Sequence, residues 1–177
     1  DSDLVGEPFL PNELVVVASP SHRLAHRSSI PVAELAGEPF LLREPGSGTR
    51  AAAERFFAAA GIQLTVAMEL GSNSAIKRAV ANELGIAVIS RQAVSLEVDA
   101  GILTILDVEG FPILRHWHVV HRRSRRLSPA AQAFKDLLLN GTAVRGETRP
   151  ESTPPPAPRR PSGRRPRRTD RERPSGR

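Results

Sequence analysis

The chain contains no cysteine among its 177 residues. A disulfide framework and any metal site built on thiolates are therefore excluded, and the composition suits a reducing compartment. No apolar run approaches the roughly 20 residues that a membrane-spanning helix needs, and no basic-then-apolar signal segment opens the chain. These absences favour a cytoplasmic, globular protein without membrane contact, whose 40% hydrophobic content is enough to bury a core.

Catalytic and metal-binding motifs are also missing. The sequence has no GxSxG, HExxH or Walker loop and no paired carboxylates. His22 and His26 have i,i+4 spacing, but their segment is loop-like and no third ligand accompanies them. His116 and His118 share one face of an expected strand, where packing beside Trp117 or surface exposure is the simpler interpretation. We therefore expect neither an enzyme nor a protein that carries a metal or another cofactor.

Positive charge is unevenly distributed along the chain. The formal net charge is +6 and the pI is about 11.2, which would suit a nucleic-acid-binding protein. Residues 141–177, however, contain 11 Arg against 4 acidic residues, whereas residues 1–140 contain 14 Lys and Arg against 15 acidic residues. This Pro/Arg-rich tail has almost no apolar side chains, so we expect it to be disordered. It would act as a solubilising appendage or as a weak electrostatic contact for nucleic acid or acidic partners.

Ahead of the tail, short apolar segments alternate with amphipathic ones. Residues 14–18 (LVVVA) form a continuous, largely β-branched run, which is typical of a strand covered on both faces. Three further strands are predicted at 40–43, 63–70 (QLTVAMEL) and 86–89, the second with unequal faces. Helices are predicted between them at 53–60 and 74–84, each followed by a glycine. This order indicates two βαβ crossovers and a parallel sheet.

The pattern continues beyond residue 90. A short helix and two strands are predicted at 92–96, 102–108 and 116–121. Ser128 and Pro129 then have the residue types of an N-cap and a first helical position. We expect this last helix to end at residues 140–141 and to turn three side chains inward: Phe134, Leu137 and Leu138.

Two loops carry the strongest functional signal. Residues 45–49 (PGSGT) and 71–74 (GSNS) each follow an expected strand and precede an expected helix. In a parallel α/β sheet, ligands bind at this edge, where helix N-termini present unsatisfied N–H groups. The glycines allow close approach of the backbone, and the hydroxyls of Ser47, Thr49 and Ser72 can either cap a helix or bind a ligand.

Arg50 is informative because it lies in the first turn of its expected helix. The helix macrodipole disfavours a cation there by about 0.3 to 1 kcal/mol. A bound anion would reverse this effect, because charge-assisted hydrogen bonds contribute about 1.5 to 3 kcal/mol each. The structural alternative is an i,i+4 ion pair with Glu54, with Ser47 or Thr49 as an ordinary N-cap. The sequence thus predicts a site for a carboxylate, a sulfate or a phosphoryl group, with this alternative left open.

Four segments resemble one protein family in a single register from about residue 4 to 139. They are ELVVVASPSHRLA (13–25), LLREPGSGTR (41–50), MELGSNSAIKRAVANELGIAVISRQAV (68–94) and LTILDVEGFPILRHWHVVHRRSRRLSPAAQAF (103–134). These segments resemble the effector-binding domain of LysR-type transcriptional regulators. Within that family, REPGSGTR, GFPI with the nearby Arg115 and Trp117, and LSPAAQAF resemble the regulators of Calvin-cycle (rubisco) operons.

The resemblance implies an α/β, periplasmic-binding-protein-like (type II) fold, with two lobes joined by two crossover strands. It divides the chain into four parts: a remnant of the first lobe with the first crossover strand (1–21), the second lobe (22–112), a return strand and helix (113–140), and the disordered tail (141–177). We expect one complete lobe plus part of the other. The chain opens with Asp rather than Met, so we also expect a fragment truncated at its N-terminus.

The resemblance also implies a function: sensing of a small anionic effector, such as a phosphorylated metabolite or NADPH, in the interlobe cleft to control transcription. DNA would be bound only through a winged helix-turn-helix absent from this chain, and the full-length protein would be a homodimer or homotetramer. The implied effector-binding residues are Ser19, Pro20, Ser47, Gly48, Thr49, Arg50, Ser72 and Asn73.

Two alternatives remain open at this point. GSGTR at a helix start also resembles the phosphate- and oxyanion-binding proteins of ABC transporters, and a metabolic enzyme can use the same two-lobe fold. A secretory signal upstream in the gene would favour the transporter, and an upstream helix-turn-helix would favour the regulator. Catalysis without any regulatory partner would indicate the enzyme.

Overall fold

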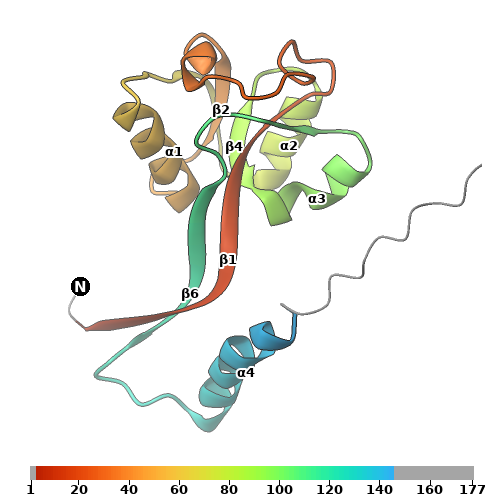
Figure 1. The fold of residues 1–177 in the computed structure, drawn as a ribbon. Helices are drawn as coiled ribbons and strands as arrows, with labels where there is room; N and C mark the ends of the chain where they lie inside the picture. The colour runs from red at the N-terminus through yellow and green to blue at the C-terminus, as the bar shows by residue number, and fades with distance from the viewer. Residues whose placement is uncertain (1–2, 146–177) are drawn as a thin grey trace, which may run out of the picture.

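The structure, a computed structural model, describes residues 3–145 (Figure 1). The prediction that the tail is disordered falls, from residue 146 onward, outside the described residues. In chain order the elements are β1 (Leu4–Ala18), the 3₁₀ helix η1 (Val32–Leu35), β2 (Pro39–Arg43), α1 (Gly48–Ala59), β3 (Thr65–Leu70), α2 (Asn73–Ala81), β4 (Ala87–Ser90), α3 (Arg91–Asp99), β5 (Thr104–Leu106), β6 (Ile113–Arg122) and α4 (Pro129–Arg145).

Strands β1 to β5 of the lobe belong to two sheets that meet side by side. β2 and β3 are parallel, and Phe40 forms a parallel bridge with Ile86, just before β4. The Ile86 N–H donates to the Pro39 carbonyl and the Leu41 N–H donates to the Ile86 carbonyl, both at 2.9 Å. β1 runs antiparallel to β4 and to β5, which gives the order β4-β1-β5, and the bridge at Ile86 joins this sheet to the β2-β3 pair. The two predicted βαβ crossovers are confirmed, and an antiparallel strand inserted beside them completes the sheet.

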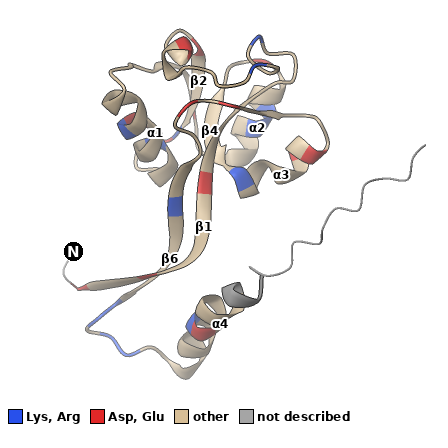
Figure 2. Cartoon of the chain, viewed as in Figure 1, with Lys and Arg blue, Asp and Glu red and all other residues tan. Residues whose placement is uncertain are grey.

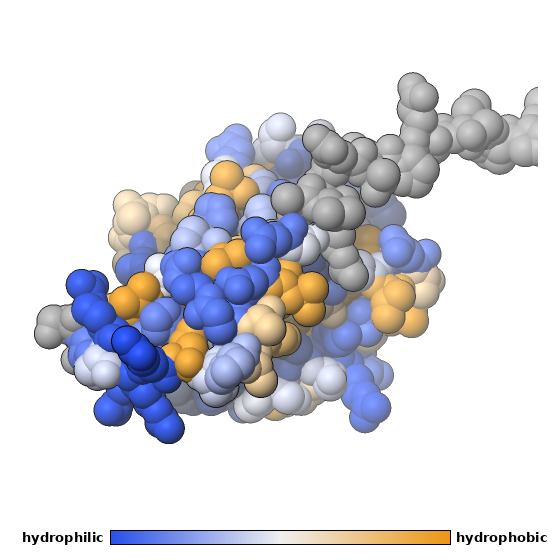
Figure 3. All heavy atoms as spheres, turned by 90° about the horizontal axis from the view of Figure 1, so that it is seen from below, coloured by the Kyte–Doolittle hydropathy of each residue, from blue (hydrophilic) through white to orange (hydrophobic). Residues whose placement is uncertain are grey.

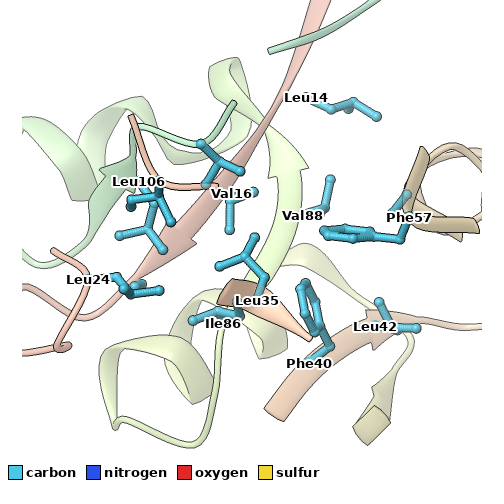
Figure 4. Packing of buried hydrophobic residues seen from close by; sticks show 14 of the residues in the cluster. Leu14, Val16, Leu24, Leu35, Phe40, Leu42, Phe57, Ile86, Val88 and Leu106 are labelled. Carbon is cyan, nitrogen blue, oxygen red and sulfur yellow. The ribbon is translucent and has the colours of Figure 1, made fainter. Parts of the chain in front are cut away.

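The upper half of β1 crosses the centre of the core. Its residues 14–18 are at most 1% exposed and alternate between two apolar clusters. Leu14, Val16 and Ala18 pack on the side of α1, together with Phe40, Phe57 and Val88 (Figure 4). Val15 and Val17 pack on the other side, against α2 and α3. The prediction of a strand covered on both faces is therefore confirmed, and its physical basis is one apolar side chain for each face in turn.

The lower half of β1 leaves the lobe as a two-stranded ribbon with β6 (Figure 1). The antiparallel register runs from Leu14 opposite Ile113 to Leu4 opposite Arg122, and it shifts between Pro8 and Leu10. The sequence did not predict this part of β1, because Gly and Pro are unfavourable inside strands. A two-stranded ribbon tolerates proline because its outer edges need no hydrogen-bond donor.

Helix α4 lies beside the ribbon and away from the lobe (Figure 1). Its predicted start is confirmed, since the Ala131 N–H donates to Ser128 Oγ at 3.2 Å. The predicted end is wrong, because the helix continues to Arg145. The expected inward orientation is wrong for Phe134 and Leu137, which are 60% and 65% exposed. Among the described residues, α4 has only the narrow ribbon to pack against, so most of its apolar surface stays exposed.

Strand β3 is confirmed at the edge of the sheet, but its two faces are not as unequal as the alternation suggested. Val66 is 44% and Met68 is 41% exposed. Because an edge strand has a neighbour on one side only, alternation alone does not bury its apolar side chains. The last small elements also differ in length from those predicted: α3 covers residues 91–99, and β5 covers only 104–106.

Gly85 offers a test of the junction between β2 and β4. Its φ is +148°, and a Cβ at this position would lie 2.3 Å from the Pro39 carbonyl oxygen. We expect Gly85→Ala to lower the free energy of unfolding by about 2 to 4 kcal/mol, since it combines backbone strain with a clash against main chain. Gly37→Ala is the control, because nothing lies within 4 Å of its added Cβ. Urea denaturation of both variants measures the difference, and equal stabilities would contradict the close approach.

Candidate functional site

A cavity of about 260 Å³ lies where the start of α1 faces the β1–β6 ribbon. Its lining comes from both parts, the lobe and the ribbon: Asn12, Arg43, Ser47, Gly48, Thr49, Arg115, His116 and Trp117. This lining contains two arginines and no carboxylate. Three of the residues predicted to bind the effector, Ser47, Gly48 and Thr49, are brought together here.

The N-terminus of α1 meets the cavity without a side-chain cap. Ser47 is the N-cap residue and has an extended backbone, but its side chain makes no capping hydrogen bond. No acidic residue lies in the first turn, so nothing there compensates the positive end of the helix dipole. Ser72 behaves differently at the start of α2, because its Oγ accepts a hydrogen bond from the Ala75 N–H at 3.2 Å. The Ser47 hydroxyl is thus the one left available to a ligand.

Arg115 connects the ribbon to this helix start. Its Nη1 donates a hydrogen bond to the Gly48 carbonyl at 2.6 Å. The guanidinium lies against Gly48, where an added Cβ would be 3.4 Å from both of its terminal nitrogens, an ordinary van der Waals distance. Arg115 forms no ion pair with any residue in the described part of the chain. The site therefore holds a positive charge that no carboxylate neutralises.

Arg43 has a different environment. Its Nε and Nη2 donate to the Glu44 carboxylate at 2.7 and 2.8 Å, and its Nη1 donates to Asn73 Oδ1 at 2.9 Å. The hydrogen bond with Glu44 raises the pKa of Arg43, and the same contact lowers the pKa of the Glu44 carboxyl. Arg43 is therefore largely neutralised and positions the two loops, 45–49 and 71–74, relative to each other.

Arg50 does not line the cavity. Its guanidinium donates to Glu54 Oε1 and to Glu69 Oε1, both at 2.7 Å, and to the Arg43 carbonyl at 3.1 Å. These hydrogen bonds raise the pKa of Arg50, and the bond to Glu54 has the larger effect. The i,i+4 ion pair that the sequence offered as the structural alternative is present. A direct role for Arg50 in anion binding stays a prediction, and in this structure both carboxylates would compete with the anion.

The second predicted loop contributes indirectly. Ser72 is occupied as the cap of α2, and Asn73 reaches the site through its contact with Arg43. Neither residue is part of the cavity lining. Their effect on a ligand would therefore be to position Arg43 rather than to bind the ligand directly.

Ser19 and Pro20 were expected at the cleft. In the structure they lie at the opposite ends of the strands from the cavity. β1 is antiparallel to β4, with Leu14 opposite Ser90 and Val17 opposite Ala87. The end of β1 therefore lies beside the start of β4, whereas the cavity lies toward the end of β4. Ser19 Oγ instead shares a hydrogen bond of 2.8 Å with Ser21 Oγ.

Sequence reasoning missed the residues that the ribbon contributes. Asn12 is 6% exposed, and Ser90 Oγ donates to its Oδ1 at 2.7 Å. No local pattern marks Asn12, which follows a proline in a segment not predicted as a strand. Arg115 and Trp117 were not predicted as binding residues, although a basic and an aromatic residue two apart on a strand share one face.

Aromatic side chains fix α1 against the turn that leads into β6. Phe57 packs edge-on against Phe40, with ring centroids 5.2 Å apart. Phe56 packs in the same way against Phe111, at 4.7 Å. Because residue 111 closely precedes β6, these contacts hold the start of the strand that carries Arg115 at a set distance from the helix.

Residues 3–145 also bear on metal binding and membrane insertion. No three His, Cys, Asp or Glu side chains of this part are grouped so that they could hold a metal ion. His22 instead contacts the Glu38 carboxylate, with Nε2 and Oε2 3.2 Å apart. None of the helices in this part is long and apolar enough to cross a membrane.

Comparison with known proteins identifies the family. Residues 1–143 match the LysR substrate binding domain, and the chain belongs to this family. Its relatives include a RuBisCO operon transcriptional regulator of Allochromatium vinosum, 46% identical over 141 residues that cover 80% of this chain and 47% of the relative. The HTH-type transcriptional activator CmpR of Synechocystis is 46% identical over 131 residues, which cover 74% and 43%. The chain thus spans about half the length of the curated relatives it matches.

Solved structures agree with this assignment. The regulatory domain of CcmR from Synechocystis, in complex with 2-PG, has a TM-score of 0.75 and 44% identity, covering 79% of this chain and 67% of that one. The effector-binding domain of QuiR, in complex with shikimate, has a TM-score of 0.73 at 24% identity, covering 81% and 68%, and shows the fold alone. The predicted LysR effector-domain fold and the resemblance to rubisco operon regulators are therefore confirmed. The four-part division of the chain stays a prediction.

The two helix starts predict stability losses of different size when a serine hydroxyl is removed. We expect Ser72→Ala to lower the free energy of unfolding by about 1 kcal/mol, because it removes the cap of α2. Ser47→Ala should change it by less than about 0.5 kcal/mol, because no capping bond is lost. Thermal and urea unfolding of the pair test this. A loss for Ser47→Ala as large as that for Ser72→Ala would show that its hydroxyl caps α1.

Proposed function

We propose that this domain is the sensor of a transcriptional regulator and that it binds a small anion, most simply a phosphorylated metabolite, in the cavity at the start of α1. One observation carries the proposal: the Arg115 guanidinium, which has no carboxylate partner within residues 3–145, lies beside a helix N-terminus that has no side-chain cap. Both features stabilise negative charge, and both belong to the same cavity.

The available groups fit an oxyanion. The N–H groups at the start of α1 and the hydroxyls of Ser47 and Thr49 can donate to its oxygens, while Arg115 supplies a fork of N–H donors. Each charge-assisted hydrogen bond contributes about 1.5 to 3 kcal/mol. The lining adds the indole of Trp117, half exposed, as an apolar wall. The described cavity of about 260 Å³ suits a short phosphorylated acid better than a dinucleotide such as NADPH.

The comparison supports the same ligand class. The CcmR regulatory domain, 44% identical to this chain, is described in complex with 2-PG, which is 2-phosphoglycolate. The two relatives given above are named as transcriptional regulators. Their names favour a regulator over an ABC-transporter receptor or an enzyme. We extend to this protein a cytoplasmic location, DNA binding through a helix-turn-helix encoded outside this chain, and assembly as a homodimer or homotetramer.

Ligand binding would change the position of the ribbon relative to the lobe. The lining combines α1 of the lobe with Asn12 and Arg115 of the ribbon, so an anion that contacts both sides favours one arrangement of the two. The ligand can shift this equilibrium only by its different affinity for the two arrangements, typically about 1 to 3 kcal/mol. Because the ribbon is the connection between the lobe and α4, this shift is how occupancy would reach the rest of the regulator.

Substitution of Arg115 tests the site. In the complete gene product we expect Arg115→Gln to weaken binding of 2-phosphoglycolate by about 10- to 100-fold, the loss of one charge-assisted contact. Isothermal titration calorimetry measures it, with inorganic phosphate and glycolate titrated separately. A receptor of the transporter type would bind inorganic phosphate alone about as tightly as the phosphorylated acid.

Arg50→Gln is the matched variant, because it removes the same charge from the first turn of the same helix but outside the cavity lining. It should leave affinity within about threefold. Loss of binding with Arg50→Gln and not with Arg115→Gln would move the anion to the outer face of α1 and refute the assignment of the cavity.

A further inference from the structure

The segment between β6 and α4 concentrates positive charge at the end of the ribbon far from the cavity. Four of its five residues 122–126, here called the arginine loop, are arginines: Arg122, Arg123, Arg125 and Arg126. All four are exposed, and none forms an ion pair with a described residue. Residues 1–140 have a net charge of −1, so without these arginines that part of the chain would carry −5. The loop is therefore a local cationic surface on an otherwise acidic body.

The backbone of the arginine loop is held in place. The Arg123 N–H donates to the Asp3 carbonyl at 2.7 Å. The Ser124 N–H and Oγ donate to the two carboxylate oxygens of Asp3, at 3.1 and 2.9 Å. The nearby carboxylate is thus used to fix the loop and is not paired with an arginine. Fixing the backbone lowers the conformational entropy that would be lost when the arginines engage a partner.

The loop borders a broad hollow beside the start of α4. This hollow has a volume of about 630 Å³ and its lining contains no carboxylate. Three arginines, Arg122, Arg125 and Arg126, line it together with His121, Ser128 and four apolar residues: Leu4, Val120, Leu127 and Ala131. In Figure 2 the chain below β6 is coloured blue along much of the connection to α4, which marks Lys and Arg positions. Figure 3, the view from below, shows a group of strongly hydrophilic residues at the lower left of the molecule. A partner approaching from this side meets positive charge without any acidic residue from the lining.

We propose that the arginine loop contacts the phosphate backbone of duplex DNA. The choice of DNA among polyanions rests on the proposed function of this domain in a DNA-bound regulator. Guanidinium groups match phosphate oxygens by paired hydrogen bonds, and duplex DNA presents one charge for about every 1.7 Å of its axis. The loop has four such groups within five residues and no aromatic side chain among them. This arrangement fits contacts that position a domain on DNA without reading its sequence.

The proposal assigns different anions to the two ends of β6. Arg115 faces the cavity near the start of the strand, and Arg122 ends it at the loop. A change in the angle of the ribbon at the cavity would therefore move the loop relative to the DNA, so that occupancy of one end alters contacts at the other.

The salt dependence of DNA binding tests the proposal. Fluorescence anisotropy of a labelled duplex, titrated with the 177-residue chain between about 50 and 200 mM salt, gives the slope of log K against log salt concentration. The slope should become shallower by about 0.9 for each arginine that contacts a phosphate, hence by about 1.8 for R125Q/R126Q and about 3.6 for all four substitutions. The tail is present in every variant, so its contribution is common to all of them.

R55Q/R78Q is the matched control, because it removes two exposed arginines from α1 and α2 that form no ion pair with described residues. This control should leave the slope within about 0.5 of the unmodified chain. Equal slopes for the two pairs would overturn the proposal, as would a loop variant that loses binding to polyglutamate while its DNA binding is unchanged. Thermal unfolding confirms that each variant is folded. Failure of the anion to bind at Arg115 would refute the proposed function without altering this slope, so the two failures are distinguishable.

Discussion

The antiparallel pairing of β1 is the constraint on which the structure depends. The strand is buried between two layers of helices at one end and forms a solvated ribbon with β6 at the other. Burial of its apolar half stabilises the lobe by the transfer of branched side chains from water. In the other half, the β1–β6 ladder places Arg115 opposite Asn12, and its guanidinium contacts the Gly48 carbonyl at the start of α1. Core stability and site geometry are therefore set by one continuous strand.

The candidate site depends on this arrangement because neither side completes it. The lobe supplies a helix N-terminus and the Ser47 hydroxyl, and the ribbon supplies the cation. Arg43 is already matched by Glu44 and Asn73, and Arg50 by Glu54 and Glu69. Of the three arginines near the helix start, Arg115 alone has no carboxylate partner among the described residues. This imbalance distinguishes a binding group from structural ion pairs of the same residue type.

Local patterns predicted much of the fold and part of the site. The apolar run at 14–18, the two crossovers and the cap at Ser128 depend on nearby residues, so periodicity and capping chemistry were sufficient. Ser47, Gly48 and Thr49 were found because their loop precedes a helix. The direction of β1 relative to β4 is a long-range property that the sequence did not reveal. Because the two strands are antiparallel, Ser19 and Pro20 lie at the end of the sheet away from the cavity. For Arg50, local spacing offered the pair with Glu54 but not the second partner, Glu69, which lies on a neighbouring strand.

The register shift in the ribbon, between Pro8 and Leu10, has an architectural consequence. Asn12 and Arg115 lie on the lobe side of this irregularity, and Leu4 and Arg122 lie on the other side. In an uninterrupted ladder, gain or loss of one residue would reverse the facing of every side chain beyond it. A bulge can absorb such a change, because it already accommodates unequal residue numbers on the two strands. The distal part of the ribbon can therefore vary in length and twist during evolution while the geometry around the helix start is preserved.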